Sequence, residues 1–147
     1  LFLGFTFNWG ALLGWAAVTG SLTAAPIALY AAGVVWTLGY DTIYAHQDKD
    51  DDALVGIKST ALLFGTATRP WLIGFYGTAL VLLLAAGYLA GLGWPFYALM
   101  AAGAVHLGWQ ANTVDIADPK DCLGKFKSNR DFGLIVLAGI IAGRVIG

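Results

Sequence analysis

The sequence predicts an all-α transmembrane protein, a multi-helix bundle to which these residues contribute five membrane spans. Of its 147 residues, 59% are hydrophobic and 12% are charged, about half the charged share of a soluble domain. The mean hydropathy is +0.72. Residues 1–40 and 70–114 contain no Asp, Glu, Lys or Arg. A soluble helical bundle would need polar outer faces on these segments, so the pattern favours helices surrounded by lipid.

Five stretches approach the roughly 20 apolar residues that a membrane-spanning helix needs. Pro26 suits a first helical turn, and glycine and proline at positions 91–95 separate two neighbouring stretches. The last stretch is the shortest and contains Arg144, a side chain long enough to reach the membrane surface. We therefore expect helices over residues 2–19, 26–45, 71–90, 95–113 and 132–147.

Basic residues indicate the orientation of these helices. If the spans alternate in direction, seven of the eight basic residues fall in the two connections on one side: Lys49, Lys58, Arg69, Lys120, Lys125, Lys127 and Arg130. The positive-inside rule makes this side cytoplasmic. The formal charge of −1 is not that of a nucleic-acid-binding surface. The single cysteine, Cys122, excludes an internal disulfide. Because the chain begins without methionine or a charged leader, we expect an N-terminal part to be missing.

An acidic cluster follows the second expected helix, with five aspartates in residues 41–52. On a continuing helix, Asp41, Tyr44, Asp48 and Asp52 would fall within about 80° of one another. Like charges at this spacing repel unless a cation neutralises them, and carboxylates suit hard cations such as Mg²⁺, Mn²⁺ or Ca²⁺. The alternative is a solvated acidic loop. An ionisable residue at the end of an uncharged span, as at Asp41, favours a functional site.

Two basic islands could serve an anionic substrate. Lys58 lies beside two hydroxyl residues, and Lys125, Lys127 and Arg130 fall in the expected connection before the last helix, where they could line an entrance. The alternative is that these residues only determine topology. We expect His106 to be a hydrogen-bonded interior residue, and neither His46 nor Cys122 to be a site residue.

The pattern that begins Asp41-x-x-Tyr44 and ends Asp48-x-x-x-Asp52, followed by Gly-Ile-Lys-Ser-Thr at 56–60, resembles the second aspartate-rich motif of the UbiA superfamily of intramembrane prenyltransferases. The stretches GYDTIYAHQDKDDDALVGIKSTALLFG and DCLGKFKSNRDFG are similar to its branch that acts on 4-hydroxybenzoate. The resemblance implies a nine-helix fold around a central cavity, with residues 1–147 as the C-terminal part of a single transmembrane prenyltransferase domain. A first motif, of N-D-x-x-D type, would lie in the missing half, so the isolated chain should be inactive.

The resemblance also implies an activity: Mg²⁺-dependent transfer of a polyprenyl group from polyprenyl diphosphate to the ring of 4-hydroxybenzoate, in ubiquinone biosynthesis. Asp41, Asp48 and Asp52 would bind the metal, and Asp48, Asp52 and Tyr44 would be catalytic. Lys58, Tyr44 and Arg130 would bind the diphosphate. The expected location is a bacterial inner (plasma) membrane or the mitochondrial inner membrane, with the motif loops on the cytoplasmic or matrix side.

Besides a purely structural membrane subunit, in which the aligned carboxylates would be a coincidence, two alternatives remain at this stage. The first is a prenyltransferase of the same superfamily for another acceptor, such as a naphthoate, a homogentisate or a porphyrin. The second is a cation transporter subunit, which would place ionisable residues near the membrane midplane. The expected helices 2–19, 71–90 and 95–113 contain no Asp, Glu, Lys or Arg, which disfavours a transporter.

Overall fold

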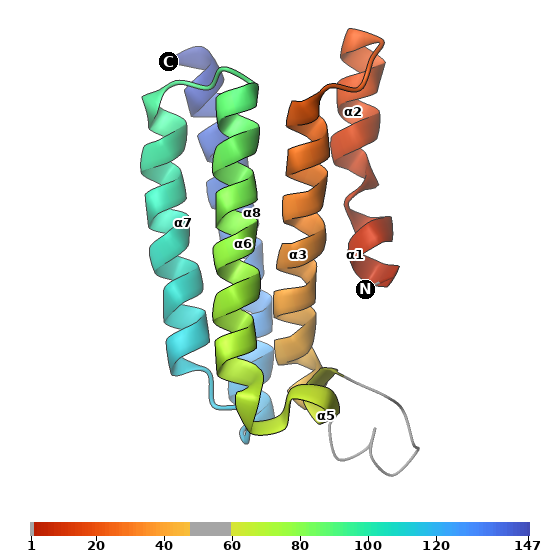
Figure 1. The fold of residues 1–147 in the computed structure, drawn as a ribbon. Helices are drawn as coiled ribbons and strands as arrows, with labels where there is room; N and C mark the ends of the chain where they lie inside the picture. Colours follow the sequence, from red (N-terminus) through yellow and green to blue (C-terminus); the bar gives the residue numbers. More distant parts are fainter. Residues whose placement is uncertain (1, 48–59) are drawn as a thin grey trace.

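The computed structural model describes residues 2–47 and 60–147, and within these ranges every regular element is a helix. The helices are α1 (Phe2–Phe7), α2 (Trp9–Thr19), α3 (Ala24–Gln47), α5 (Thr60–Phe64), the 3₁₀ helix η1 (Gly65–Ala67), α6 (Thr68–Leu89), α7 (Trp94–Thr113) and α8 (Pro119–Val145) (Figure 1). The all-α prediction is confirmed for the described part of the chain. The three central helices expected from the sequence are found with their ends shifted by at most three residues.

The first expected helix is broken in two at Asn8. This residue lies outside helical geometry (φ −95°, ψ 2°). Its amide Nδ2 donates to the Gly4 carbonyl at 2.7 Å and to Thr37 Oγ1 of α3 at 3.2 Å. An asparagine side chain that bonds to nearby backbone competes with the helical ladder. Asn8 thereby ends α1 and ties the break to α3.

The last helix begins much earlier than expected. α8 starts at Pro119 rather than near residue 132, so residues 119–131 are helical and our assignment of this stretch to a loop was wrong. Asp118 caps the helix, because its carboxylate accepts the Lys120 N–H at 2.9 Å, and proline follows at the first helical position, which suits its fixed φ. Polar residues therefore form the first half of α8, and the apolar half begins at Phe132.

The four long helices α3, α6, α7 and α8 form a bundle, and α1 and α2 lie along the outer side of α3 (Figure 1). The buried core between them includes Ile43, Leu72, Phe96, Met100 and Phe132. Two glycines permit especially close packing. A Cβ at Gly39 would lie 2.4 Å from the Tyr76 ring, and one at Gly87 would lie 2.2 Å from the Phe96 ring. Small residues at helix contacts are typical of membrane bundles.

The connections fall at two opposite ends of the bundle. The α2–α3 and α6–α7 connections and the C-terminus lie at one end, and α5 and the α7–α8 connection lie at the other (Figure 1). This is the separation expected from the alternating directions of the spans. By length and composition, α6 is apolar enough to cross a membrane, with a mean hydropathy of 2.0, and it is the one helix of the described residues that meets this criterion.

Candidate functional site

The acidic stripe begins on the last turns of α3. Asp41 is half-buried, and Tyr44, one turn later, is 40% exposed. Within the described part of the chain, Asp41 makes no hydrogen bond or ion pair, and the Tyr44 hydroxyl has no hydrogen-bond partner. Since α3 is continuous to Gln47, these two side chains share one face, as expected. They are available to a ligand.

The rest of the predicted site lies outside the described residues. This applies to Asp48, Asp52 and Lys58, which fall within residues 48–59. In the described ranges, no group of three or more His, Cys, Asp or Glu side chains is placed to hold a metal ion. The three-carboxylate metal site therefore stays a prediction, with Asp41 as the one member whose surroundings are known.

Phe126 of α8 packs the basic segment 125–130 against the end of α3 that carries Asp41 and Tyr44. Its ring lies 4.8 Å from the Tyr44 ring and 5.7 Å from the Tyr40 ring, measured between centroids. This contact is possible because α8 begins at Pro119, so that Phe126 is part of a helix packed against α3. Residues that are more than 80 positions apart in the sequence are thus packed together at one end of the bundle.

The basic residues of this segment differ in their surroundings. Lys125 is only 7% exposed. Its Nζ contacts Asp121 Oδ1 at 3.0 Å and lies 4.5 Å from the centre of the Trp109 ring, so it is used within the fold rather than at an entrance. Lys127 is exposed. Arg130 pairs with Asp131 at 3.0 Å in an exposed position, where such pairs contribute little stability.

Asn129 and Trp36 form a link that the sequence did not reveal. Trp36 Nε1 donates to Asn129 Oδ1 at 2.9 Å, and the Asn129 amide donates to the carbonyls of Lys125 and Phe126. The Trp36 ring also lies 5.0 Å from Phe132 and 5.3 Å from Tyr40. Asn129 is 6% exposed. It therefore fixes the orientation of a tryptophan one turn before Tyr40.

A buried polar network holds the neighbouring helices together. Tyr76 Oη donates to Gln110 Oε1 at 2.8 Å, and Gln110 Nε2 donates to Ser128 Oγ at 2.8 Å. His106 Nε2 lies 3.1 Å from the Ser128 carbonyl oxygen, which confirms that His106 is a hydrogen-bonded interior residue. The network joins α6, α7 and α8 beneath the candidate site, and buried polar groups satisfied in this way specify one packing arrangement.

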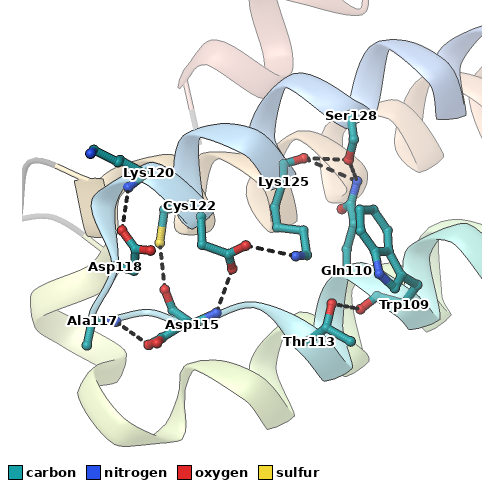
Figure 2. A network of polar contacts seen from close by, with 11 residues as sticks. Trp109, Gln110, Thr113, Asp115, Ala117, Asp118, Lys120, Cys122, Lys125 and Ser128 are labelled. Atoms are coloured by element: carbon teal, nitrogen blue, oxygen red, sulfur yellow. Dashed lines mark hydrogen bonds and ion pairs between the residues drawn. The ribbon is translucent and has the colours of Figure 1, made fainter.

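The α7–α8 connection is fixed by its own polar contacts (Figure 2). The Ala117 N–H donates to Asp115 Oδ1 at 2.9 Å, and the Cys122 thiol donates to the Asp115 carbonyl at 3.4 Å. Burial raises the pKa of Cys122 to about 11, with a smaller contribution from the nearby aspartates. The thiol therefore stays protonated at neutral pH and is not a nucleophile. His46, buried at the end of α3, contacts Thr68 Oγ1 at 2.8 Å and links α3 to α6.

Asp121 makes the stability of this connection depend on pH. Its carboxylate accepts the Asp115 N–H at 2.8 Å and the Lys125 ammonium at 3.0 Å, and both contacts, the first more strongly, lower the pKa of Asp121 below its ordinary value of 3.8. A lowered pKa stabilises the fold above that ordinary value, and the contribution is lost as pH falls through the folded-state pKa.

We expect Asp121→Asn to lower the thermal stability of the detergent-solubilised protein at neutral pH, and the difference from the unmodified protein to shrink below pH 3.8. Asp131→Asn, which removes an exposed pair, is the matched control and should change stability little at either pH. A difference for Asp121→Asn that is constant with pH would contradict this assignment.

A groove runs along α3 towards the candidate site. Its larger cavity, about 860 Å³, lies between α2, α3, α6, α7 and α8 and is lined mostly by apolar atoms, with Arg144 among the lining residues. A second cavity of about 500 Å³ shares Gly10, Ala11, Leu29 and Leu83 with the first and extends to Trp36. Along α3 the order is thus the large cavity, the small cavity, Trp36, and then Asp41 with Tyr44.

Arg130 lies on the groove side of α8. Positions 130, 133 and 137 share one helix face, and Gly133 and Leu137 line the smaller cavity. The groove is therefore apolar along its length, and Asp41, Tyr44 and Arg130 follow beyond its Trp36 end in the sequence of α3 and on α8 without lining either cavity. This arrangement fits a molecule with a long apolar part and a charged head.

These features are those of a helical protein with an apolar groove and a polar cluster near one end of its bundle. The chain belongs to the UbiA prenyltransferase family, whose sequence model matches residues 1–136. This confirms the resemblance drawn from the aspartate-rich motif.

Several relatives carry the name 4-hydroxybenzoate polyprenyltransferase, mitochondrial. The chain is 54% identical to the Arabidopsis thaliana protein, an alignment that covers 97% of this chain and 35% of that protein. It is 54% identical to the Homo sapiens protein and 56% identical to the Mus musculus protein, in both cases over 99% of this chain and 39% of the relative. The chain thus spans less than half the length of these relatives and corresponds to their C-terminal part. No solved structure matches the chain.

Proposed function

We propose that this chain is the C-terminal part of a single transmembrane prenyltransferase domain that transfers a polyprenyl group from polyprenyl diphosphate to the ring of 4-hydroxybenzoate. The observation that supports this most is the apolar groove along α3, whose lining extends to Trp36, five residues before Asp41 on the same helix. The names of the relatives supply the substrates. The same names support a place in ubiquinone biosynthesis.

The proposal places five spans in the membrane: α1 with α2, then α3, α6, α7, and α8 from Phe132 onward. Large apolar side chains point outward along the bundle, among them Val18, Val81, Val105 and Ile141, which are 86%, 66%, 74% and 55% exposed. Such side chains suit a lipid environment. The relatives' names place those proteins in mitochondria, and we propose the mitochondrial inner membrane or a bacterial plasma membrane for this chain, with α5 and the α7–α8 connection on the matrix or cytoplasmic side.

A divalent cation fits the donor groups at this end of the groove. Asp41 presents a carboxylate that no described residue binds, and oxygen donors suit Mg²⁺. Asp41, Asp48 and Asp52 are the residues we propose to hold it. When bound there, Mg²⁺ supplies positive charge that favours departure of the diphosphate.

The chain's own residues would then orient both ends of the donor. Lys58, Arg130 and the Tyr44 hydroxyl donate hydrogen bonds to diphosphate oxygens. The C–O bond of the donor breaks with its electron pair on the diphosphate, and an allylic cation remains. The ring carbon ortho to the acceptor's hydroxyl forms the new C–C bond, and its proton leaves. Trp36, Tyr40 and Tyr44 follow one another along α3, and their ring faces would attract the developing positive charge.

Tyr44 offers a test that separates its two roles. Tyr44→Phe keeps the ring contact with Phe126 and removes only the hydroxyl. Because a hydrogen bond to a charged group contributes about 1.5–3 kcal/mol, kcat/KM for the donor should fall by roughly 10-fold or more. Tyr44→Ala should also reduce stability, through the lost ring contact.

The control is Tyr88→Phe, at an exposed tyrosine on the far end of α6. It should leave kcat/KM unchanged. If Tyr44→Phe behaves like this control, Tyr44 does not contact the diphosphate.

The proposed function is tested with the full-length protein in membranes, supplied with a polyprenyl diphosphate and a panel of acceptors. 4-Hydroxybenzoate should be prenylated in preference to naphthoate, homogentisate and porphyrin acceptors. Preference for another acceptor would show that this family member differs from the relatives it matches.

A further inference from the structure

Asn129 of α8 holds the indole of Trp36 by a hydrogen bond between two helices. Trp36 Nε1 donates to Asn129 Oδ1 at 2.9 Å. Asn129 Nδ2 donates in turn to the carbonyl oxygens of Lys125 and Phe126, at 3.2 Å and 3.1 Å. An indole N–H can only donate and a carbonyl oxygen can only accept, so one orientation of the Asn129 amide satisfies all three partners. The amide is thus fixed by its own helix before it meets Trp36.

The same helix also contacts the opposite edge of the indole. A Cβ built at Gly133, one turn after Asn129, would lie 3.6 Å from Trp36 Cη2. The rings of Phe132 and Tyr40 lie 5.0 Å and 5.3 Å from the Trp36 ring, measured between centroids. Apolar contacts are not directional, whereas a hydrogen bond has a preferred angle. The bond to Asn129 is therefore the contact that selects one orientation of the ring.

Trp36 begins a row of three aromatic side chains on α3. Trp36, Tyr40 and Tyr44 follow at intervals of four residues, a spacing that places side chains on one helix face. In the described part of the chain, the Tyr40 hydroxyl bonds within α3, to Thr37, whereas the Trp36 nitrogen bonds to α8. Tryptophan attracts a cation more strongly than tyrosine does. The ring of the row that is best suited to a cation is thus the one that a second helix holds in place.

We propose that Asn129 is a positioning residue for prenyl transfer and that it acts through Trp36. This inference rests on the proposed function and adds a residue outside the aspartate-rich motif. The hydrogen bond keeps the indole face preorganised for the positive charge that develops as the diphosphate leaves. That charge is present in the transition state and not in the bound donor, so loss of the bond lowers kcat rather than raising KM.

The experiment compares the full-length enzyme and its Asn129→Leu variant in membranes, with a polyprenyl diphosphate, 4-hydroxybenzoate and Mg²⁺. Leucine is close to asparagine in size and can neither accept the indole N–H nor donate to the two carbonyls. The kcat per amount of folded enzyme should fall by about 10-fold. KM for the donor should stay within about 2-fold of its original value.

A double substitution tests whether Asn129 acts through Trp36. Trp36→Phe keeps an aromatic ring and removes the N–H, and it should also lower kcat. If Asn129 has no other route to the reaction, Asn129→Leu should cause little further loss in the Trp36→Phe enzyme. A general packing defect would instead multiply the two losses. Asn129→Ala replaces Asn129→Leu if the leucine variant does not accumulate in membranes, and it should lower kcat in the same way.

Asn112 on α7 provides the matched control. Its Oδ1 accepts from Arg69 of α6, and its Nδ2 donates to the Gly108 carbonyl one turn earlier, which repeats the bonding pattern of Asn129. These described contacts involve no aromatic ring. Asn112→Leu should therefore leave both kcat and KM unchanged.

An unchanged kcat in the Asn129 variants, a raised KM with the original kcat, or losses that multiply in the double variant would overturn this inference and leave the proposed function standing. A loss of kcat in Asn112→Leu equal to that in Asn129→Leu would overturn it too. An unmodified enzyme that transfers no prenyl group would overturn the proposed function, and this inference with it.

Discussion

Replacing Asp48 or Asp52 by asparagine in the full-length protein is expected to abolish prenyl transfer, with a loss of roughly 100-fold or more. Asparagine keeps the size of the side chain and removes the negative charge that holds a hard cation. Charge stabilisation by a metal contributes several kcal/mol to such a reaction, and each 1.36 kcal/mol changes the rate tenfold. The measurement is transfer of label to 4-hydroxybenzoate in membranes that contain equal amounts of each variant.

The chain offers its own control for this prediction. Asp50→Asn and Asp51→Asn remove the same charge from positions that fall off the predicted stripe. They should retain most of the activity. Near-normal turnover in both Asp48→Asn and Asp52→Asn, or equal losses in all four variants, would contradict the assignment of metal ligands.

The second large effect is expected at Gln110. This residue is fully buried and accepts a hydrogen bond from Tyr76 while donating one to Ser128. Gln110→Leu would leave the buried Tyr76 hydroxyl without its acceptor, and such a group costs about 1–3 kcal/mol. The detergent-solubilised protein should therefore unfold at a lower temperature than the unmodified one.

A double substitution distinguishes the lost hydrogen bond from a packing defect. Tyr76→Phe combined with Gln110→Leu removes both partners, which is often close to neutral. The double variant should regain part of the stability lost in Gln110→Leu. Tyr76→Phe is also measured alone. If the stability losses of the two single variants simply add in the double variant, the lost Tyr76–Gln110 hydrogen bond is not the cause.

The sequence predicted a helix well where a long uncharged stretch was the main pattern. Long uncharged stretches predicted α3, α6 and α7, because apolar length is what a membrane-spanning helix requires. The start of α8 was missed because a charged stretch was taken for a loop. A helix can carry such a stretch when it is capped, and Asp118 with Pro119 provides this cap. The break at Asn8 depends on Thr37, a partner on another helix, which periodicity within one segment does not reveal.

The candidate site, like the helices, was predicted from the sequence only in part. The shared face of Asp41 and Tyr44 follows from helical spacing alone, and it was predicted. The bond between Trp36 and Asn129 joins residues 93 positions apart, so no local pattern contains it. Asn129 on its own gave little indication that it bonds to Trp36. The groove is also lined by residues from five separate helices, and their arrangement appears only once the helices are packed.

The most direct test is prenyl transfer by the full-length protein in membranes, with labelled 4-hydroxybenzoate, a polyprenyl diphosphate, and either Mg²⁺ or EDTA. The 147-residue chain is expressed beside it. We expect prenylated product from the full-length protein with Mg²⁺, none with EDTA, and none from the short chain. Product in the presence of EDTA, or product from the short chain alone, would contradict a metal site shared between these residues and the first aspartate-rich motif that the resemblance implies.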